Sequence, residues 1–346
     1  MAITFSTYPE RQILAGVPRI GFDVHLCPFP GTLDAYLKYV GDPQDYDYLM
    51  GISGAAFRRL WNRDDGRNID LSHLGDEPFR RVFDALGYEW RKVPAEKEAM
   101  IQAIKASLAQ EHPAIAFGIV GPPEAGLVAG YAEDGAVLLG WSYFQDQREH
   151  YYEQRDWFET MRVNGDRRKG LILIGDRLPA RPPAREVLAA SLEWALDLAR
   201  TAHRPNLPEH LCGLAAYDAW ADALEVDADY LPNNDGTMGT RIVIHGDQYV
   251  MIEERHEAAR FLRRMKDVAP EAADHLEAAA ALYNRIGDSV TLLWPWPIDP
   301  GAGAMQALAD GRTRRALARH VRTARDKEAK AVEHLEAALT ILYGAR

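Results

Sequence analysis

The stretch Gly21-Phe-Asp-Val-His-Leu-Cys-Pro-Phe-Pro-Gly31 decides how the first half of this chain is expected to fold. Directly after it, apolar residues recur at i, i+3, i+4 and i+7, the spacing of one helix face, at Leu33, Tyr36, Leu37 and Val40. The sequence therefore predicts that Cys27 opens a helix. A thiol there meets unpaired backbone N–H groups and the positive end of the helix dipole, and both favour the thiolate.

Two interpretations of Cys27 follow. The first is an activated nucleophile at a helix start. The second is a buried structural or ligand-lining thiol, because free cysteine is among the residue types most often found in protein interiors.

Composition narrows the class of protein. The chain has 346 residues, a net charge of −11 and two cysteines, Cys27 and Cys212. Two cysteines exclude a disulfide framework and a Cys-rich zinc module, and they suit a reducing cytoplasm. Residues 1–20 contain no apolar signal segment, and no apolar run approaches the roughly 20 residues that span a bilayer. We therefore expect a cytoplasmic protein that binds neither membrane nor nucleic acid.

The first half mixes helix and strand patterns. Glu133-Asp-Gly135 joins two strand-like runs as a hairpin turn, which makes those strands antiparallel. Predicted helices come first and a series of antiparallel strands follows, and this order of elements favours an α+β fold over alternating α/β. Helices are predicted over 54–61, 77–86 and 95–108, and strands over 88–93, 114–119, 126–131, 136–141 and 171–174.

A proline-rich stretch, 178–183, marks a change of character. We predict an α+β domain over residues 1–177 and a mainly α-helical domain over 184–346. In the second domain one strand is expected at 241–245, a polar loop at 227–240 and an aromatic turn at 294–297. Its helices are predicted over 188–199, 213–224, 249–265, 271–283 and 313–342.

Several short motifs resemble a known group. In cysteine-nucleophile enzymes, a helix-opening Cys pairs with a His carried by an antiparallel sheet later in the domain. The chain resembles the papain-like fold of the bacteriocin-processing-peptidase type, and more closely the butirosin biosynthesis protein H N-terminal family. The resemblance covers most of the chain and is carried by His25-Leu-Cys27-Pro, Tyr48-Leu-Met-Gly-Ile-Ser-Gly54, Gly130-Tyr131 with the Asp134-Gly135 turn, and Gly213-Leu-Ala-Ala-Tyr-Asp-Ala-Trp220.

The resemblance implies a papain-like N-terminal domain and acyl transfer by a thiol. In bacterial natural-product assembly, an aminoacyl group would move from a carrier-protein thioester to an amine. We therefore expect a thiol-dependent acyltransferase or amidohydrolase acting on a small amide or thioester, with no cofactor and no metal.

The chain departs from the peptidases of this fold at the residues that matter most. Glu124 stands where they carry the catalytic His, and Gly140 or Trp141 stands where they carry Asp or Asn. This argues against a peptidase and leaves an inactive papain-like binding protein as the alternative. His25, two residues before Cys27, is a candidate base. Glu124 is a candidate base too, although a carboxylate beside a thiol suits a cationic ligand amine better.

Four further features each have a functional and a plain interpretation. Ser53, within Gly51-Ile-Ser-Gly-Ala55, resembles a nucleophile elbow or caps a helix. Arg63, Asp64 and Asp65 form a ligand cluster or a surface turn. Trp141 and Tyr143 line a ligand pocket or belong to the core. The last feature is a run of basic residues, which is interpreted either as a docking site for an acyl carrier protein or as a solvated helix face. It comprises Arg312, Arg314, Arg315, Arg319, Arg322 and Arg325.

Overall fold

The computed structural model describes residues 11–64, 71–164, 170–231, 235–293 and 301–344. The chain divides into two units. Unit 1 comprises Met1–Tyr46 and Leu86–Arg181, and unit 2 comprises Asp47–Ala85 and Pro182–Arg346. The sequence predicts residues 47–85 to be part of the N-terminal domain, because the composition changes only near 178–183. In the structure these residues group with the C-terminal helices.

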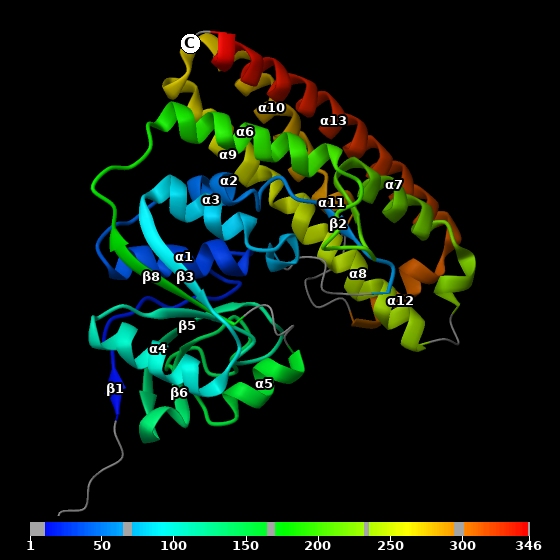
Figure 1. Ribbon diagram of the computed structural model, residues 1–346. Coiled ribbons are helices and arrows are strands. Elements are labelled where there is room, and N and C mark those ends of the chain that lie inside the picture. The colour runs from blue at the N-terminus through cyan, green and yellow to red at the C-terminus, as the bar shows by residue number, and fades with distance from the viewer. Residues whose placement is uncertain (1–10, 65–70, 165–169, 232–234, 294–300, 345–346) are drawn as a thin grey trace, which may run out of the picture. The chain divides into compact units, whose positions relative to one another are not determined.

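An antiparallel sheet organises unit 1 (Figure 1). Its strand order is β3-β8-β4-β5-β6-β7, and β1 pairs with β5. The predicted α+β class with an antiparallel N-terminal sheet is confirmed. The strands are β1 (Gln12–Ile13), β3 (Tyr88–Val93), β4 (Ala114–Phe117), β5 (Ala125–Ala132), β6 (Val137–Trp141), β7 (Tyr152–Gln154) and β8 (Leu171–Arg177).

The hairpin between β5 and β6 has the predicted turn. Glu133, Asp134 and Gly135 all have positive φ angles, of 51°, 61° and 96°. A Gly and an Asp adopt that backbone region more readily than bulky residues do. The turn sets the β5–β6 register, in which Leu127 pairs with Trp141.

Among the described residues of unit 1, three helices accompany this sheet: α1 (Pro28–Tyr39), α4 (Lys97–Ala109) and α5 (Trp157–Asn164). The helix predicted after Cys27 is confirmed as α1, which is buried over Pro28–Leu37. The Thr32 hydroxyl donates a hydrogen bond of 3.2 Å to the Ala125 carbonyl, which ties the first turns of α1 to the start of β5.

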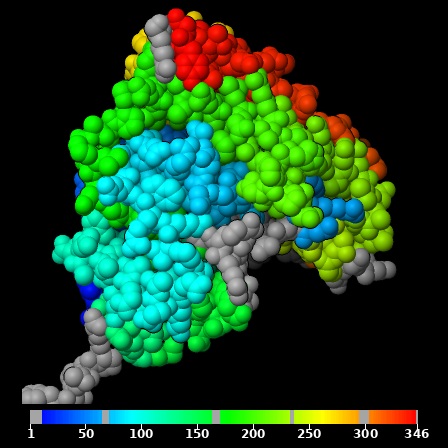
Figure 2. All heavy atoms as spheres, viewed as in Figure 1, coloured from blue at the N-terminus to red at the C-terminus, as the bar shows by residue number. Residues whose placement is uncertain are grey.

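Unit 2 is mostly helical, as predicted, and α13 forms its orange-to-red band in Figure 2. A short pair of strands, β2 (Leu60–Trp61) and β9 (Leu211–Cys212), accompanies the helices. The helices are α2 (Tyr46–Ser53), α3 (Glu77–Leu86), α6 (Ala184–Arg200), α7 (Gly213–Leu224), α8 (Asp235–Glu253), α9 (Arg255–Arg264), α10 (Ala273–Gly287), α11 (Val290–Leu293), α12 (Gly301–Ala309) and α13 (Gly311–Gly344).

Buried ion pairs explain why residues 47–85 belong to unit 2. Arg255 on α9 pairs with Glu328 on α13 at 2.8 Å and also donates to the carbonyls of Ala56 and Arg58. Arg58 in turn pairs with Glu254 at 2.8 Å. These charges are 0–2% exposed, so removal of one partner would leave a charge buried without compensation.

Four predicted elements are wrong. The polar loop predicted at 227–240 contains a 3₁₀ helix, Asp227–Tyr230, and the start of α8 at Asp235. The helix predicted at 54–61 is a turn leading into β2, because Gly54 adopts φ +81° and ends α2. The strand predicted at 241–245 lies inside α8. The helix predicted at 249–265 is two helices, α8 and α9, that meet at Glu254. The aromatic turn at 294–297 lies outside the described residues. In the described part of the chain, no helix combines the length and apolar character that a membrane span needs.

Candidate functional site

Cys27 lies at the N-terminus of α1, where the sequence predicts it. It is the N-cap residue in an extended conformation (φ −90°, ψ 115°), and Pro28 begins the helix. Its side chain is 1% exposed. Its backbone N–H donates a hydrogen bond of 3.0 Å to the hydroxyl of Tyr46.

His25, which precedes α1, is paired with a carboxylate on that helix. Its Nε2 atom lies 3.0 Å from Oδ2 of Asp34, and Lys38 donates to that same oxygen at 2.7 Å. The imidazole also stacks on the ring of Tyr46, with centroids 3.8 Å apart. One aromatic side chain therefore contacts both the His25 ring and the backbone of Cys27.

Asp34 is 4% exposed at its side chain, an unusual place for a carboxylate. Burial acts to raise its pKa, but the hydrogen bonds from His25 and Lys38 prevail and hold the pKa of Asp34 below its usual value. Asp34 is thus a buried anion that orients His25. The sequence pattern around Cys27 did not predict this role for Asp34. The available signal was an acidic residue two helical turns after Cys27, within a run of apolar residues, with Lys38 four residues further on.

Tyr143 follows β6 and reaches the first turn of α1. A Cβ atom at Gly31 would lie 2.0 Å from the Tyr143 hydroxyl oxygen and 3.0 Å from the Cβ of His25, so only glycine leaves room for the ring. The Tyr143 side chain is 4% exposed, and its hydroxyl has no hydrogen-bond partner in the described part of the chain. Burial, and then the nearby charges of Cys27, Asp34 and Glu124, raise the pKa of Tyr143 well above its usual value.

Glu124 lies immediately before β5 and is partly exposed. Its backbone carbonyl accepts a hydrogen bond of 3.1 Å from Gly118. Its charge is close enough to act on Tyr143. The structure therefore brings Cys27, His25, Glu124 and Tyr143 to the same end of unit 1.

A hollow of about 440 Å³ opens beside the His25–Asp34 pair. Its polar walls include one cation, Lys38, and two carboxylates, and it is of a size that suits a small molecule. It is lined by His25, Asp34, Lys38, Pro43, Gln44, Asp45 and Tyr46.

The side chain of Trp141 makes structural contacts within unit 1. Its indole N–H donates to the Val17 carbonyl at 2.9 Å, and its ring meets Tyr151 edge-on at 4.9 Å. These contacts hold the segment around Val17 against β6.

The remaining predicted ligand residues lie in unit 2. Ser53 is fully buried at the last turn of α2, where its hydroxyl donates to the Met50 carbonyl and accepts from the Ala55 amide. It therefore ends a helix instead of capping the start of one. Arg63 pairs with Asp229 at 2.5 Å, and Asp64 accepts from Arg241 at 3.3 Å. Asp65 lies outside the described residues.

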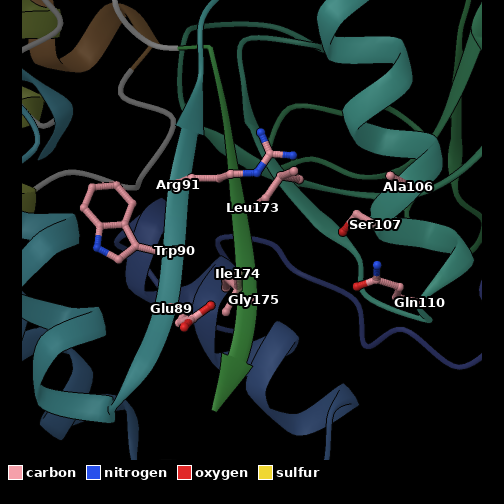
Figure 3. Close-up of a pocket in the computed structure, with 9 residues that line it drawn as sticks. All are labelled: Glu89, Trp90, Arg91, Ala106, Ser107, Gln110, Leu173, Ile174 and Gly175. Atoms are coloured by element: carbon pink, nitrogen blue, oxygen red, sulfur yellow. The ribbon is translucent and has the colours of Figure 1, made fainter. Parts of the chain in front are cut away.

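A second hollow, of about 250 Å³, lies between α4 and strands β3 and β8 (Figure 3). The side chain of Arg91 extends toward α4, whereas Trp90 points away from the other labelled residues. Glu89 and Arg91 are exposed, and the lining contains none of the predicted site residues. We therefore regard this hollow as a surface depression and not as a candidate active site.

The basic run on α13 is largely engaged within unit 2. Arg314 is 2% exposed and donates to the carbonyls of Leu224 and Leu308 at 3.0 and 2.7 Å. Arg322 pairs with Asp222 and Glu225 at 2.8 and 2.9 Å. Exposed positions on the run are Arg312, Arg315 and Arg319.

In the described ranges, no three or more His, Cys, Asp and Glu side chains are grouped so that they could hold a metal ion. Comparison of the sequence with models of protein families and with curated proteins finds no match.

Proposed function

We propose that this chain is a thiol-dependent acyltransferase or amidohydrolase of the cytoplasm, acting on a small amide or thioester. Unit 1 would be its papain-like catalytic domain, with Cys27 as the nucleophile. The observation that carries the proposal is the His25–Asp34 pair, 3.0 Å between Nε2 and Oδ2, next to a cysteine that opens a helix. A nucleophile, an imidazole and an orienting carboxylate are the three roles of a catalytic triad.

The proposed reaction has two halves. The Cys27 thiol gives its proton to Nδ1 of His25, the ring nitrogen that does not face Asp34, and the sulfur attacks the substrate carbonyl. The resulting oxyanion collapses, the C–S or C–N bond to the leaving group breaks, and the leaving thiol or amine takes the proton from His25. Water or an acceptor amine then attacks the thioester on Cys27 in the same manner and restores the thiol.

The substrate class rests on the resemblance to the butirosin biosynthesis protein H N-terminal family. An aminoacyl thioester from natural-product assembly is the proposed acyl donor, with an acyl carrier protein as its carrier. The exposed Arg312, Arg315 and Arg319 are the proposed contacts for that acidic partner.

A catalytically inactive binding protein is the second candidate. Two observations favour it: the Cys27 side chain is 1% exposed, and Glu124 replaces the sheet-borne His of the peptidases. In that case the hollow beside His25 and Asp34 would hold a small ligand without covalent chemistry.

Alkylation separates the two candidates. We would titrate the native protein with iodoacetamide from about pH 5 to pH 9 and follow the adduct by intact mass, with Cys27→Ser and His25→Gln as variants. The enzyme proposal expects Cys27 to react below pH 7 and to slow in His25→Gln. Cys212 serves as the internal control, because burial raises the pKa of its thiol. A Cys27 that reacts only after unfolding would favour the binding protein.

A further inference from the structure

The first turn of α1 offers few hydrogen-bond donors to an oxyanion. In an ordinary helix the first amide N–H groups have no partner within the helix and can receive a negative charge. Here Pro28 and Pro30 have no N–H, and the N–H of Cys27 donates to Tyr46. The Gly31 N–H is also engaged, since it donates to the Cys27 carbonyl at 3.1 Å. The two prolines and the Cys27–Tyr46 hydrogen bond together therefore leave few backbone donors at this turn for an oxyanion.

The Tyr143 hydroxyl lies at this same turn. It is buried without a hydrogen-bond partner among the described residues, and a buried polar group in that state is costly unless a ligand completes it. Its position depends on Gly31, whose missing Cβ would otherwise lie 2.0 Å from the hydroxyl oxygen. Phe22 supports the ring edge-on at 4.9 Å.

We infer that Tyr143 donates the hydrogen bond that stabilises the substrate oxyanion, in place of the backbone amides that the two prolines remove. This inference rests on the proposed function. When the Cys27 sulfur bonds to the carbonyl carbon, the π electron pair moves to the carbonyl oxygen. The Tyr143 O–H donates to that oxygen and keeps its proton, and the pair returns when the leaving group departs.

Two features suit Tyr143 to this role. Burial and neighbouring negative charge hold its pKa well above the usual value, so the phenol stays protonated and remains a donor. The turn that carries it is also held in place, because Gln145 accepts from the Ser142 amide at 2.8 Å and donates to the His150 carbonyl at 2.9 Å. A donor fixed before the reaction needs little reorganisation in the transition state.

The test compares two reactions of Cys27 in the full-length protein. Acylation by the acetyl thioester of N-acetylcysteamine passes through an oxyanion, whereas disulfide exchange with dithiodipyridine does not. We expect Tyr143→Phe to slow acylation about 100-fold and to leave disulfide exchange within about twofold of the wild type. Tyr151→Phe is the matched control, because its hydroxyl donates to the Leu14 carbonyl at 2.9 Å instead.

Gly31→Ala provides a second variant in case Tyr143→Phe folds poorly. Alanine suits a helix, but its Cβ displaces the Tyr143 hydroxyl and also lies 3.0 Å from the Cβ of His25, so acylation is expected to fall at least as far as in Tyr143→Phe. Equal acylation by the wild type and both variants would overturn the role of Tyr143 and leave Cys27 as the nucleophile. Slowing of both reactions in Tyr143→Phe would also overturn it, since Tyr143 would then act on the thiol. If Cys27 of the wild type reacted with neither reagent, the proposed function and the role of Tyr143 would both be contradicted.

Discussion

His25 and Asp34 form a hydrogen-bonded pair on unit 1, with 3.0 Å between Nε2 and Oδ2. Because hydrogen bonds outweigh burial and lower the pKa of Asp34, the charged carboxylate stabilises the native state above its ordinary pKa of 3.8. That stabilisation is lost as the pH falls through the lowered pKa. We expect Asp34→Asn to unfold at lower temperature than the wild type at pH 7, and the difference to shrink below about pH 3.8.

Asp23→Asn is the control for this prediction. Asp23 also pairs with a cation, Arg19, at 2.7 Å, but its side chain is 47% exposed, and exposed pairs contribute little. Thermal unfolding of both variants between about pH 2.5 and pH 7 checks the comparison. Equal and small shifts in the two variants would contradict a stabilising role for Asp34.

Gly54 is a position where we expect a large loss of stability from a single added methyl group. It has φ +81°, and a Cβ there would lie 2.2 Å from the indole nitrogen of Trp194. Gly54→Ala thus combines backbone strain with overpacking, and we expect a loss of about 2–4 kcal/mol in the free energy of unfolding. Denaturant unfolding monitored by circular dichroism measures it.

Gly41→Ala separates the two contributions. Gly41 has φ +77°, but a Cβ there meets nothing within 4 Å. Only the strain remains, so the loss should be about 1–2 kcal/mol. If Gly41→Ala were as damaging as Gly54→Ala, contact with Trp194 would not be the cause.

His245 makes the stability of unit 2 depend on pH. Its Nδ1 accepts from the Trp220 indole at 3.1 Å and its Nε2 donates to the Leu293 carbonyl at 2.8 Å, so the ring is neutral. Burial lowers the pKa of His245 from 6.5 to about 4. The unfolded chain therefore takes up a proton first, and stability present above pH 6.5 is lost as the pH falls towards 4, by about 3 kcal/mol.

His245→Gln tests this dependence, because an amide can offer one acceptor and one donor but does not titrate. Denaturant unfolding at pH 7 and at about pH 4.5 should show a smaller loss of stability in the variant than in the wild type. The same loss in both proteins would mean that other groups cause the acid sensitivity.

Local patterns predicted the elements around the site well. The helix after Cys27, the strand at 88–93 and the hairpin at Glu133–Gly135 depend on periodicity and turn chemistry within a short window, and the structure confirms them. The strand predicted at 241–245 was wrong because a three-residue apolar run fits a strand or a buried helix equally well. Its neighbours at 235–253 continue the helix.

Tertiary relationships account for what the sequence did not predict. Arg58 is fully buried because it pairs with Glu254, and Arg255 because it pairs with Glu328. These partners are far apart in the sequence, so the periodicity within residues 47–85 cannot reveal the pairing. The relation of Asp34 to His25 likewise depends on the turn between Gly21 and Cys27 that folds the imidazole back onto α1. The candidate residues Cys27 and His25 were recognised by chemical type, whereas Asp34 required the three-dimensional contact.

Trapping of an acyl-enzyme tests the role of Cys27 as a nucleophile. The native protein is mixed with the acetyl thioester of N-acetylcysteamine, quenched in acid and examined by intact mass and peptide mapping, with Cys27→Ser alongside. We expect one acetyl group on Cys27, none on Cys212 and none in the variant. An unmodified Cys27 in the native protein, acetylated only after unfolding, would contradict it.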